Sequence, residues 1–267
     1  SFSRTFRELE LKVPEIINVS DDGLFYIEED LGDLTLYEYS LTSERKSVLS
    51  KYENALTDLL KFQISAKDKI DYGYCYQTKK FDETAVRDDI KKFSDFYLSQ
   101  FVNDLSLINE IENITEMLVE ILNKVSDEYF LYRDFQPRNI MIKNDELYYI
   151  DYQSGRKGPL QYDAASFLYS GSIFLNENER SDLLEKYEKE LMKHIDVNKA
   201  EFRYYFYYFV FARLLQVLGS YAYIYKTRKD VKMKDKISGD LFKMNGLVNY
   251  IKDDTIINFI NKLTKSN

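Results

Sequence analysis

The sequence feature that most constrains this chain is a polar loop that leads directly into a β-hairpin pattern. The loop, RDFQPRN, covers residues 133–139, and the turn-like segment Lys143–Glu146 follows it. Short apolar runs surround both, at residues 129–132, 139–142 and 147–152. Two such runs separated by a short polar turn are typical of a hairpin. Antiparallel pairing would bring Asn139, at the start of one arm, and Asp151, at the end of the other, to the same edge.

Asp134, Asn139 and Asp151 are the residue types that phosphoryl transfer from ATP requires. A carboxylate can orient an acceptor hydroxyl and accept its proton, while an amide carbonyl and a second carboxylate are oxygen ligands that suit Mg²⁺. Asn139 follows Asp134 by five residues, and Asp151 follows Asn139 by twelve. Because Asp and Asn are also common in ordinary turns, the first two residues alone have little weight. Their combination with Arg133, the apolar runs and the hairpin is much more specific.

The rest of the chain predicts a small strand-containing front and a mainly helical body, which is an α+β fold. Strands are expected at residues 15–19 and 24–29, and helices at 2–11, 43–63, 84–101 and 111–125. Apolar residues that recur at helical spacing support the helices. After Tyr162 the chain is expected to be helical almost to its end. The Gly and Pro residues between 155 and 159 predict an irregular loop.

The composition indicates a large core and narrows the class of partner. With 267 residues, 45% of them hydrophobic, a two-lobed globular body is natural. The net charge of −8 argues against a dedicated nucleic-acid binder, because a phosphate backbone favours a basic face. Cys75 is the only cysteine, so an intramolecular disulfide is excluded. Together with the lack of a signal-peptide pattern, this favours a reducing cytoplasm.

Residues 202–225 are long and apolar enough to be compared with a membrane span. Arg203, Arg213 and Gln216 interrupt the segment, and such groups are costly in a bilayer, so we expect a buried core helix. Arg213 and Gln216 are three residues apart and therefore share one helix face. They are expected either to pair in the core or to line an acceptor pocket. His194 lies in a charged helical stretch and is expected to be solvated rather than catalytic.

The segments YRDFQPRNIMI, YYIDYQ and GPLQYDAASFLY resemble the catalytic core of the aminoglycoside phosphotransferase/choline kinase family. Within that family the chain is most similar to the bacterial sugar-kinase branch that includes N-acetylmuramate/N-acetylglucosamine anomeric kinases. The resemblance extends to FSRTFRELELKVPEI and YIEEDLGDLTLYEY near the start, and to RLLQVLGSYAY towards the end. It implies a protein-kinase-like two-lobe fold. Residues 1–31 would be the remainder of the small N-terminal lobe and the hinge, and residues 32–267 the helical C-terminal lobe.

The resemblance also implies roles for individual residues. Asp134 would be the catalytic base, and Asn139 and Asp151 would hold Mg²⁺. Backbone groups of the hinge would receive the adenine of ATP, at Glu29, Asp30 and Leu31. Asp163 would support the catalytic loop without touching the substrate.

Two arginines of the loop keep alternative roles. Arg133 could pair with a phosphate or brace the loop towards Asp163. Arg138 could bind an anion or phosphate of the substrate, or it could be plain surface charge.

The chain departs from the family pattern in three places. Tyr132 stands where the family usually has His, which indicates a structural substitution. Tyr152 and Gln153 follow Asp151, and Asp163 comes only 12 residues after it, so there is no room for the long activation segment of protein kinases. This spacing favours a small-molecule acceptor. The Gly-rich loop and strand lysine of the family have no counterpart, so either the chain lacks the first half of the small lobe or the protein is degenerate. The start at Ser1 favours truncation, and such a fragment is expected to bind ATP poorly.

These observations favour an ATP- and Mg²⁺-dependent phosphotransferase that acts on a hydroxyl of a small molecule, with a sugar or amino sugar as the expected acceptor. Two alternatives stay open: a choline- or aminoglycoside-type kinase, and a non-catalytic kinase-like binding module. The expected partners are a nucleotide and the acceptor, without nucleic acid or membrane. The sequence leaves the oligomeric state open.

Overall fold

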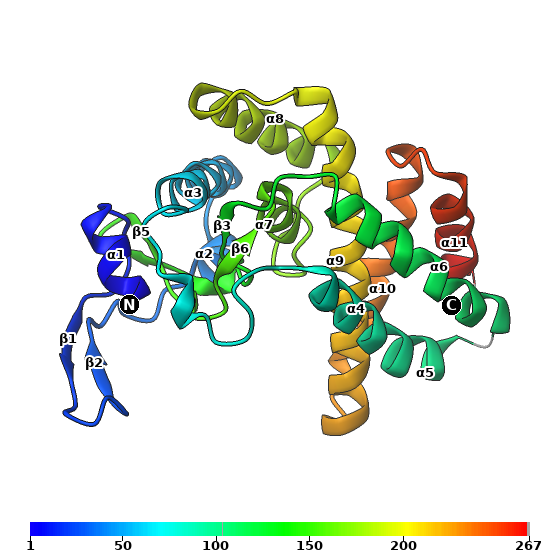
Figure 1. Ribbon diagram of the computed structural model, residues 1–267, viewed down its shortest axis with the longest axis horizontal. Helices are drawn as coiled ribbons and strands as arrows, with labels where there is room; N and C mark the ends of the chain where they lie inside the picture. The colour runs from blue at the N-terminus through cyan, green and yellow to red at the C-terminus, as the bar shows by residue number, and fades with distance from the viewer. Residues whose placement is uncertain (103, 266–267) are drawn as a thin grey trace. The chain divides into compact units, whose positions relative to one another are not determined.

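The computed structural model describes residues 1–102 and 104–265, which form helices joined by short strands (Figure 1). The α-helices are α1 Phe2–Glu8, α2 Leu36–Thr42, α3 Arg45–Ser65, α4 Glu83–Lys92, α5 Ser99–Phe101, α6 Leu105–Leu122, α7 Leu160–Leu168, α8 Glu177–His194, α9 Lys199–Arg228, α10 Lys232–Gly246 and α11 Asp254–Lys265. The strands are β1 Ile16–Val19, β2 Tyr26–Glu28, β3 Tyr129–Leu131, β4 Ile140–Lys143, β5 Glu146–Tyr149 and β6 Arg156–Gly158. Short 3₁₀ turns are η1 Tyr72–Tyr74, η3 Pro137–Asn139 and η4 Leu247–Asn249, and a π-helical segment, η2 Phe93–Leu98, continues α4. The predicted α+β class is confirmed.

The chain divides into two compact units. The first comprises residues 1–80 and 127–197, and the second residues 81–126 and 198–267. All the strands named above lie in the first unit, with α1, α2, α3, α7 and α8. The second unit is built from helices. The predicted division at residue 31, which follows the lobes of a kinase, stays a prediction.

The predicted hairpin is confirmed as the antiparallel pair β4–β5, in which Ile140 faces Tyr149 and Lys143 faces Glu146. Its turn residues Asn144 and Asp145 have φ angles of 52° and 64°. Positive φ at both positions is what a two-residue type I′ turn needs, and Asn and Asp tolerate it better than most residues. The second arm is shorter than predicted, because β5 ends two residues before Asp151.

The prediction of an irregular loop at residues 155–159 is wrong for the middle of that segment. Strand β6 pairs antiparallel with β3, with Leu131 opposite Arg156 and Tyr129 opposite Gly158. A Cβ atom at Gly158 would lie 2.5 Å from Cδ1 of Leu131. Glycine is therefore present because a neighbouring side chain packs directly on the strand backbone, and not because the chain turns there.

Aromatic rings fill the core of the first unit around Phe62 of α3. The Phe62 ring centroid lies 5.6 Å from that of Tyr132 and 5.1 Å from that of Tyr149, both in near-perpendicular arrangements. All three side chains are fully buried. Edge-to-face packing of this kind stabilises beyond the burial of area alone. It fixes the polar loop and the β4–β5 hairpin to one long helix.

Helix α9 is the core helix that the sequence predicts, and it organises the second unit. Its buried face repeats every four residues, at Phe206, Val210, Leu214 and Leu218. A Cβ atom at Gly219 would lie 2.8 Å from Cα of Phe93, so glycine allows α9 to pack closely on the start of η2. Among the residues that the structure describes, no helix is both long and apolar enough to cross a membrane.

Candidate active site

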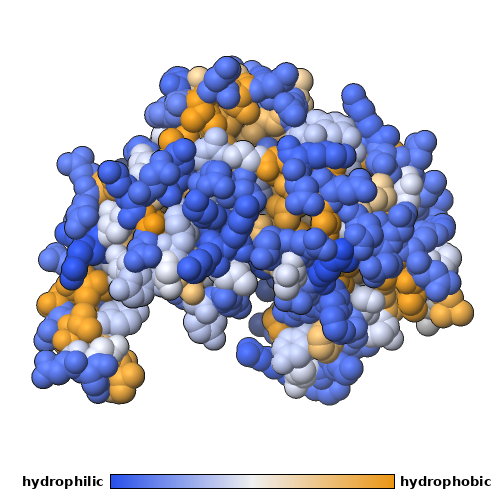
Figure 2. Space-filling model, in the orientation of Figure 1, coloured by the Kyte–Doolittle hydropathy of each residue, from blue (hydrophilic) through white to orange (hydrophobic). Residues whose placement is uncertain are grey.

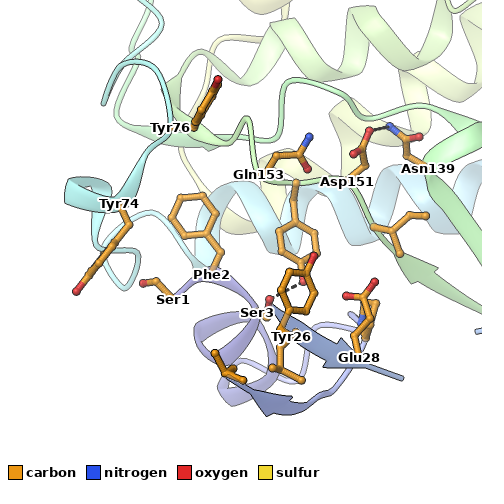
Figure 3. Close-up of a pocket in the computed structure, with 15 residues that line it drawn as sticks. Ser1, Phe2, Ser3, Tyr26, Glu28, Tyr74, Tyr76, Asn139, Asp151 and Gln153 are labelled. Carbon is orange, nitrogen blue, oxygen red and sulfur yellow. Dashed lines mark hydrogen bonds between the residues drawn. The ribbon is translucent and has the colours of Figure 1, made fainter. Parts of the chain in front are cut away.

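Of the three polar residues that the sequence singles out, Asn139 is hydrogen-bonded to both of the others. Its side-chain Nδ2 donates hydrogen bonds to Oδ2 of Asp151, at 3.0 Å, and to the backbone carbonyl of Asp134, at 2.9 Å. Asn139 ends the turn η3 and Asp151 follows β5, so the hairpin brings them to one edge, as its pairing predicts. Figure 3 shows the two side chains facing each other at this edge.

The donor set at this edge fits a small divalent cation. Both amide hydrogens of Asn139 point at oxygen acceptors, which leaves its side-chain oxygen as the atom for a metal. The Asp151 carboxylate beside it is exposed. Among the described residues, no group of three or more His, Cys, Asp or Glu side chains is placed to hold a metal ion, so a cation here would have only Asn139 and Asp151 as protein ligands. Two protein oxygens, completed by water and phosphate, are a typical environment for Mg²⁺.

Asp163 of α7 holds the start of the polar loop, directly before Asp134. Its fully buried carboxylate accepts hydrogen bonds from two successive backbone N–H groups, of Tyr132 at 2.6 Å and of Arg133 at 2.9 Å. Arg133 adopts a φ of 78°, which is unusual for a side chain of this size. Burial raises the pKa of the Asp163 carboxyl to about 7, although the two N–H groups act in the opposite direction. The contact is the one expected for loop support.

The side chain of Arg133 turns towards the same helix. Its Nη1 donates to the hydroxyl of Tyr162 at 2.7 Å, and its guanidinium lies 5.1 Å from the centre of the Tyr162 ring. The Arg133 side chain thus contacts Tyr162, and its backbone N–H meets Asp163, towards which bracing is predicted. The choice between bracing the loop and pairing with a phosphate stays a prediction.

Tyr132 provides a further support of the loop, through a hydrogen-bond partner that the sequence does not indicate. Its hydroxyl donates to the carbonyl of Ile150 at 2.6 Å, directly before Asp151. The ring is completely buried, which raises the pKa of its hydroxyl well above the usual value. Tyr132 therefore links the loop to the end of β5, in agreement with the predicted structural substitution.

Arg138 lies beside Asn139, and its guanidinium is held by two neighbouring segments. It lies 3.6 Å from the ring centre of Tyr37 in α2, and its Nε donates to the hydroxyl of Ser172 at 2.9 Å. These partners come from distant parts of the sequence and give no local signal. A role of Arg138 towards a substrate anion stays a prediction.

The predicted hinge directly follows β2. Lys143 of β4 donates to the carboxylate of Glu29 and to the backbone carbonyl of Asp30, both at 2.8 Å. The hydrogen bond from Lys143 is the main reason that the pKa of the Glu29 carboxyl lies below its usual value. Leu31 is buried. Sequence reasoning missed Lys143, and the predicted contact of this segment with adenine stays a prediction.

A cavity of about 680 Å³ opens beside Asn139 and Asp151. Its lining residues come from α1, from the β1–β2 hairpin, from the loop around η1 and from the segment after β5: Ser1, Phe2, Ser3, Pro14, Ile16, Val19, Tyr26, Glu28, Tyr74, Tyr76, Asn139, Ile150, Asp151, Tyr152 and Gln153. Asp134 and the hinge residues are not part of this lining. Tyr74 and Tyr76 were not predicted at this site, because a local sequence pattern does not show which distant loop lies beside the hairpin.

Arg213 and Gln216 lie on one face of α9 in the second unit. Nη1 of Arg213 donates a hydrogen bond to Oε1 of Gln216. This contact agrees with the pairing alternative, and a place in an acceptor pocket stays a prediction. His194, at the end of α8, is exposed, as expected for a solvated residue.

Comparison with known proteins identifies similar sequences, although no family model matches the chain. An N-acetylmuramate/N-acetylglucosamine kinase from Neisseria meningitidis serogroup B is 24% identical over 226 residues, which cover 80% of this chain and 64% of that protein. A kinase of the same name from Pseudomonas aeruginosa is 24% identical over 181 residues, covering 67% and 50%. The chain thus spans between half and two thirds of the length of these curated relatives.

Solved structures identify the fold. A choline/ethanolamine kinase family protein from Mesorhizobium loti matches with a TM-score of 0.62 and 12% identity, over 98% of this chain and 80% of that one. The choline kinase LicA from Streptococcus pneumoniae matches with 0.57 and 17%, over 92% and 78%. The gentamicin complex of APH(2")-IIa matches with 0.58 and 17%, over 96% and 80%. The chain has the protein-kinase-like fold of these proteins, and the resemblance stated from its sequence is confirmed.

Proposed function

We propose that this protein is an ATP- and Mg²⁺-dependent phosphotransferase that acts on a hydroxyl group of a small molecule, with a sugar or amino sugar as the acceptor. The observation that carries the proposal is the hydrogen-bonded connection of Asn139 to Asp151 and to the backbone of Asp134. The similarity to two sugar kinases supports the choice of acceptor.

Each polar residue has a role in this proposal. Asp134 orients the acceptor hydroxyl and takes its proton, while Asn139 and Asp151 hold Mg²⁺. When bound, Mg²⁺ neutralises charge on the phosphate groups of ATP. Asp163 and Tyr132 hold the loop so that little reorganisation is needed, which is how a site with fixed polar groups favours the transferred charge.

Replacement of Asp134 by Ala tests the proposal. In the full-length protein, the variant is expected to lose turnover by a factor of about 10² to 10⁴, the usual contribution of a general base, while binding of Mg²⁺ and ATP persists. The measurement is phosphoryl transfer to a panel of sugars and amino sugars, with the product mass determined, beside ATP binding by calorimetry. Unchanged turnover of Asp134→Ala would remove Asp134 from the reaction.

The same panel separates the alternatives. Choline and aminoglycosides are included because the choline kinase LicA and APH(2")-IIa, which was solved with gentamicin, share the fold at TM-scores of 0.57 and 0.58. Turnover of choline alone would identify the cationic-acceptor kinase. Binding of ATP without phosphorylation of any acceptor would favour the non-catalytic binding module.

A further inference from the structure

Two tyrosines of one loop line the cavity beside Asn139 and Asp151, and neither has a role in the proposed mechanism. Tyr74 and Tyr76 both line it, together with Asn139 and Asp151. Their side chains are largely exposed, at 71% and 81%. In Figure 3 the two tyrosines lie on one side of the cavity, and Asn139 and Asp151 lie on the other.

The residues that precede Tyr74 in this loop are held by local hydrogen bonds. Asp71 accepts a hydrogen bond from the backbone N–H of Gly73 at 2.8 Å, and the Tyr72 hydroxyl donates to the carbonyl of Lys67 at 3.0 Å. The Tyr72 ring also lies 5.4 Å from the ammonium group of Lys157.

The residues that follow Tyr76 are hydrogen-bonded to strand β6. The guanidinium of Arg156, which is 3% exposed, donates to Oε1 of Gln77 at 2.7 Å and to the hydroxyl of Thr78 at 2.9 Å. The backbone N–H of Lys157 donates to the carbonyl of Lys79 at 2.9 Å. A buried arginine thus holds the loop, so Tyr74 and Tyr76 are presented in place by an anchored segment. Such a platform costs little ordering entropy when a ligand binds.

The remaining lining determines which ligand suits these rings. The lining includes the hydroxyl of Ser3, which accepts a hydrogen bond from Tyr152, the amide of Gln153 and the carboxylate of Glu28. A ligand that fits both features has apolar ring faces and a rim of hydroxyl groups, which is the chemistry of a pyranose sugar. We propose that Tyr74 and Tyr76 form an aromatic subsite that binds the ring of a sugar acceptor. This inference rests on the proposed function and names residues that bind its acceptor.

Two other ligands fit less well. The segment Glu29–Leu31, to which adenine is assigned, does not line the cavity. Asp134 does not line it either, but Asn139, which donates a hydrogen bond to the Asp134 carbonyl, does and connects the cavity to the assigned base. A cationic acceptor would also be attracted by aromatic rings. It would need acidic partners, and besides Asp151, which is assigned to the metal, the lining has only Glu28.

Binding measurements on the whole chain test the subsite without depending on turnover. N-acetylglucosamine, choline and Mg²⁺–ATP are titrated separately into the wild type and into the variants Tyr74→Ala/Tyr76→Ala and Tyr74→Phe/Tyr76→Phe. Phe242→Ala is the matched control, because Phe242 is also 81% exposed but does not line the cavity. Saturation-transfer NMR and calorimetry report the dissociation constants.

The Ala pair is expected to weaken binding of N-acetylglucosamine by about two- to tenfold for each ring removed. The Phe pair restores it, because stacking needs the ring and not the hydroxyl. Neither tyrosine pair changes the binding of Mg²⁺–ATP. The control Phe242→Ala does not change the binding of N-acetylglucosamine. Equal sugar affinity in the wild type and the Ala pair overturns the inference. So does a loss confined to choline or to ATP, or a wild type that does not bind the sugar.

The outcome is separable from that of the proposed function. If Asp134→Ala leaves turnover unchanged but the Ala pair loses sugar affinity, the aromatic subsite holds and the assigned base is wrong. If Asp134→Ala abolishes turnover while the wild type and Tyr74→Ala/Tyr76→Ala bind the sugar equally, the proposed function holds and the subsite is wrong.

Discussion

At the scale of single residues, the strained backbone of Arg133 has a clear purpose. Its φ of 78° turns its N–H and that of Tyr132 towards the same buried carboxylate of Asp163. The strain, of order 1–3 kcal/mol for such a conformation, is held by these two hydrogen bonds. The local pattern around Asp134, Asn139 and Asp151 could be read from the sequence because their spacing follows from one hairpin. The partners of Arg138 and Lys143 could not, since they lie far away along the chain.

Asp163 predicts a pH dependence of stability. Its pKa is about 7 in the folded protein against an ordinary value of 3.8, so the folded state holds the proton more strongly. The resulting stabilisation is complete below about pH 4 and is lost as the pH rises towards 7. Asp163→Asn cannot ionise and should flatten this part of the profile. Its single side-chain oxygen cannot replace both carboxylate oxygens, so about 1–3 kcal/mol of stability should also be lost at pH 5.

Urea unfolding of the wild type and Asp163→Asn at pH 5 and pH 8 measures both effects. Asp182→Asn, at an exposed position of α8, controls for the loss of a carboxylate as such. An identical pH slope in wild type and Asp163→Asn would contradict the assignment.

At the scale of elements, Arg138 connects the turn η3 to α2 and to the segment before α8. Its stacking on Tyr37 and its hydrogen bond to Ser172 fix the turn that carries Asn139. We expect a coupling of about 0.5–1 kcal/mol between Arg138 and Tyr37, the usual size for an exposed cation–π contact. A double-mutant cycle with Arg138→Gln and Tyr37→Leu, followed by urea unfolding, measures it. Additive effects of the two substitutions would show that the contact does not stabilise the turn.

The elements also show where sequence reasoning ends. The β4–β5 hairpin was predictable because its strands, its turn and its pairing are adjacent in the chain. Strand β6 was not, because Gly155, Gly158 and Pro159 look like loop residues until β3 is placed beside them. The cavity could not be predicted for the same reason. The loop that carries Tyr74 and Tyr76 is held by Arg156, about eighty residues away in the sequence.

At the scale of the whole molecule, the β1–β2 hairpin is a surface on which exposed apolar residues gather. In the first unit its apolar side chains are open to solvent, with exposures between 52% and 74% for Ile17, Val19, Leu24, Phe25, Tyr26 and Ile27. Figure 2 shows this apolar surface at the lower left, where Figure 1 places β1 and β2. A two-stranded sheet with an apolar surface and open edges is a site where chains associate.

We therefore expect the 267-residue chain to bind a hydrophobic dye and to self-associate as its concentration rises. Substitution of Ile17, Phe25 and Ile27 by Ser should reduce both effects, because these side chains contribute exposed apolar area. The unfolding midpoint should change little, since exposed positions contribute about 0.5 kcal/mol or less each. Dye fluorescence and sedimentation velocity measure the result, with Phe242→Ser as a control for a single exposed aromatic residue. Equal association of the wild type and the triple variant would show that the hairpin is not the contact surface.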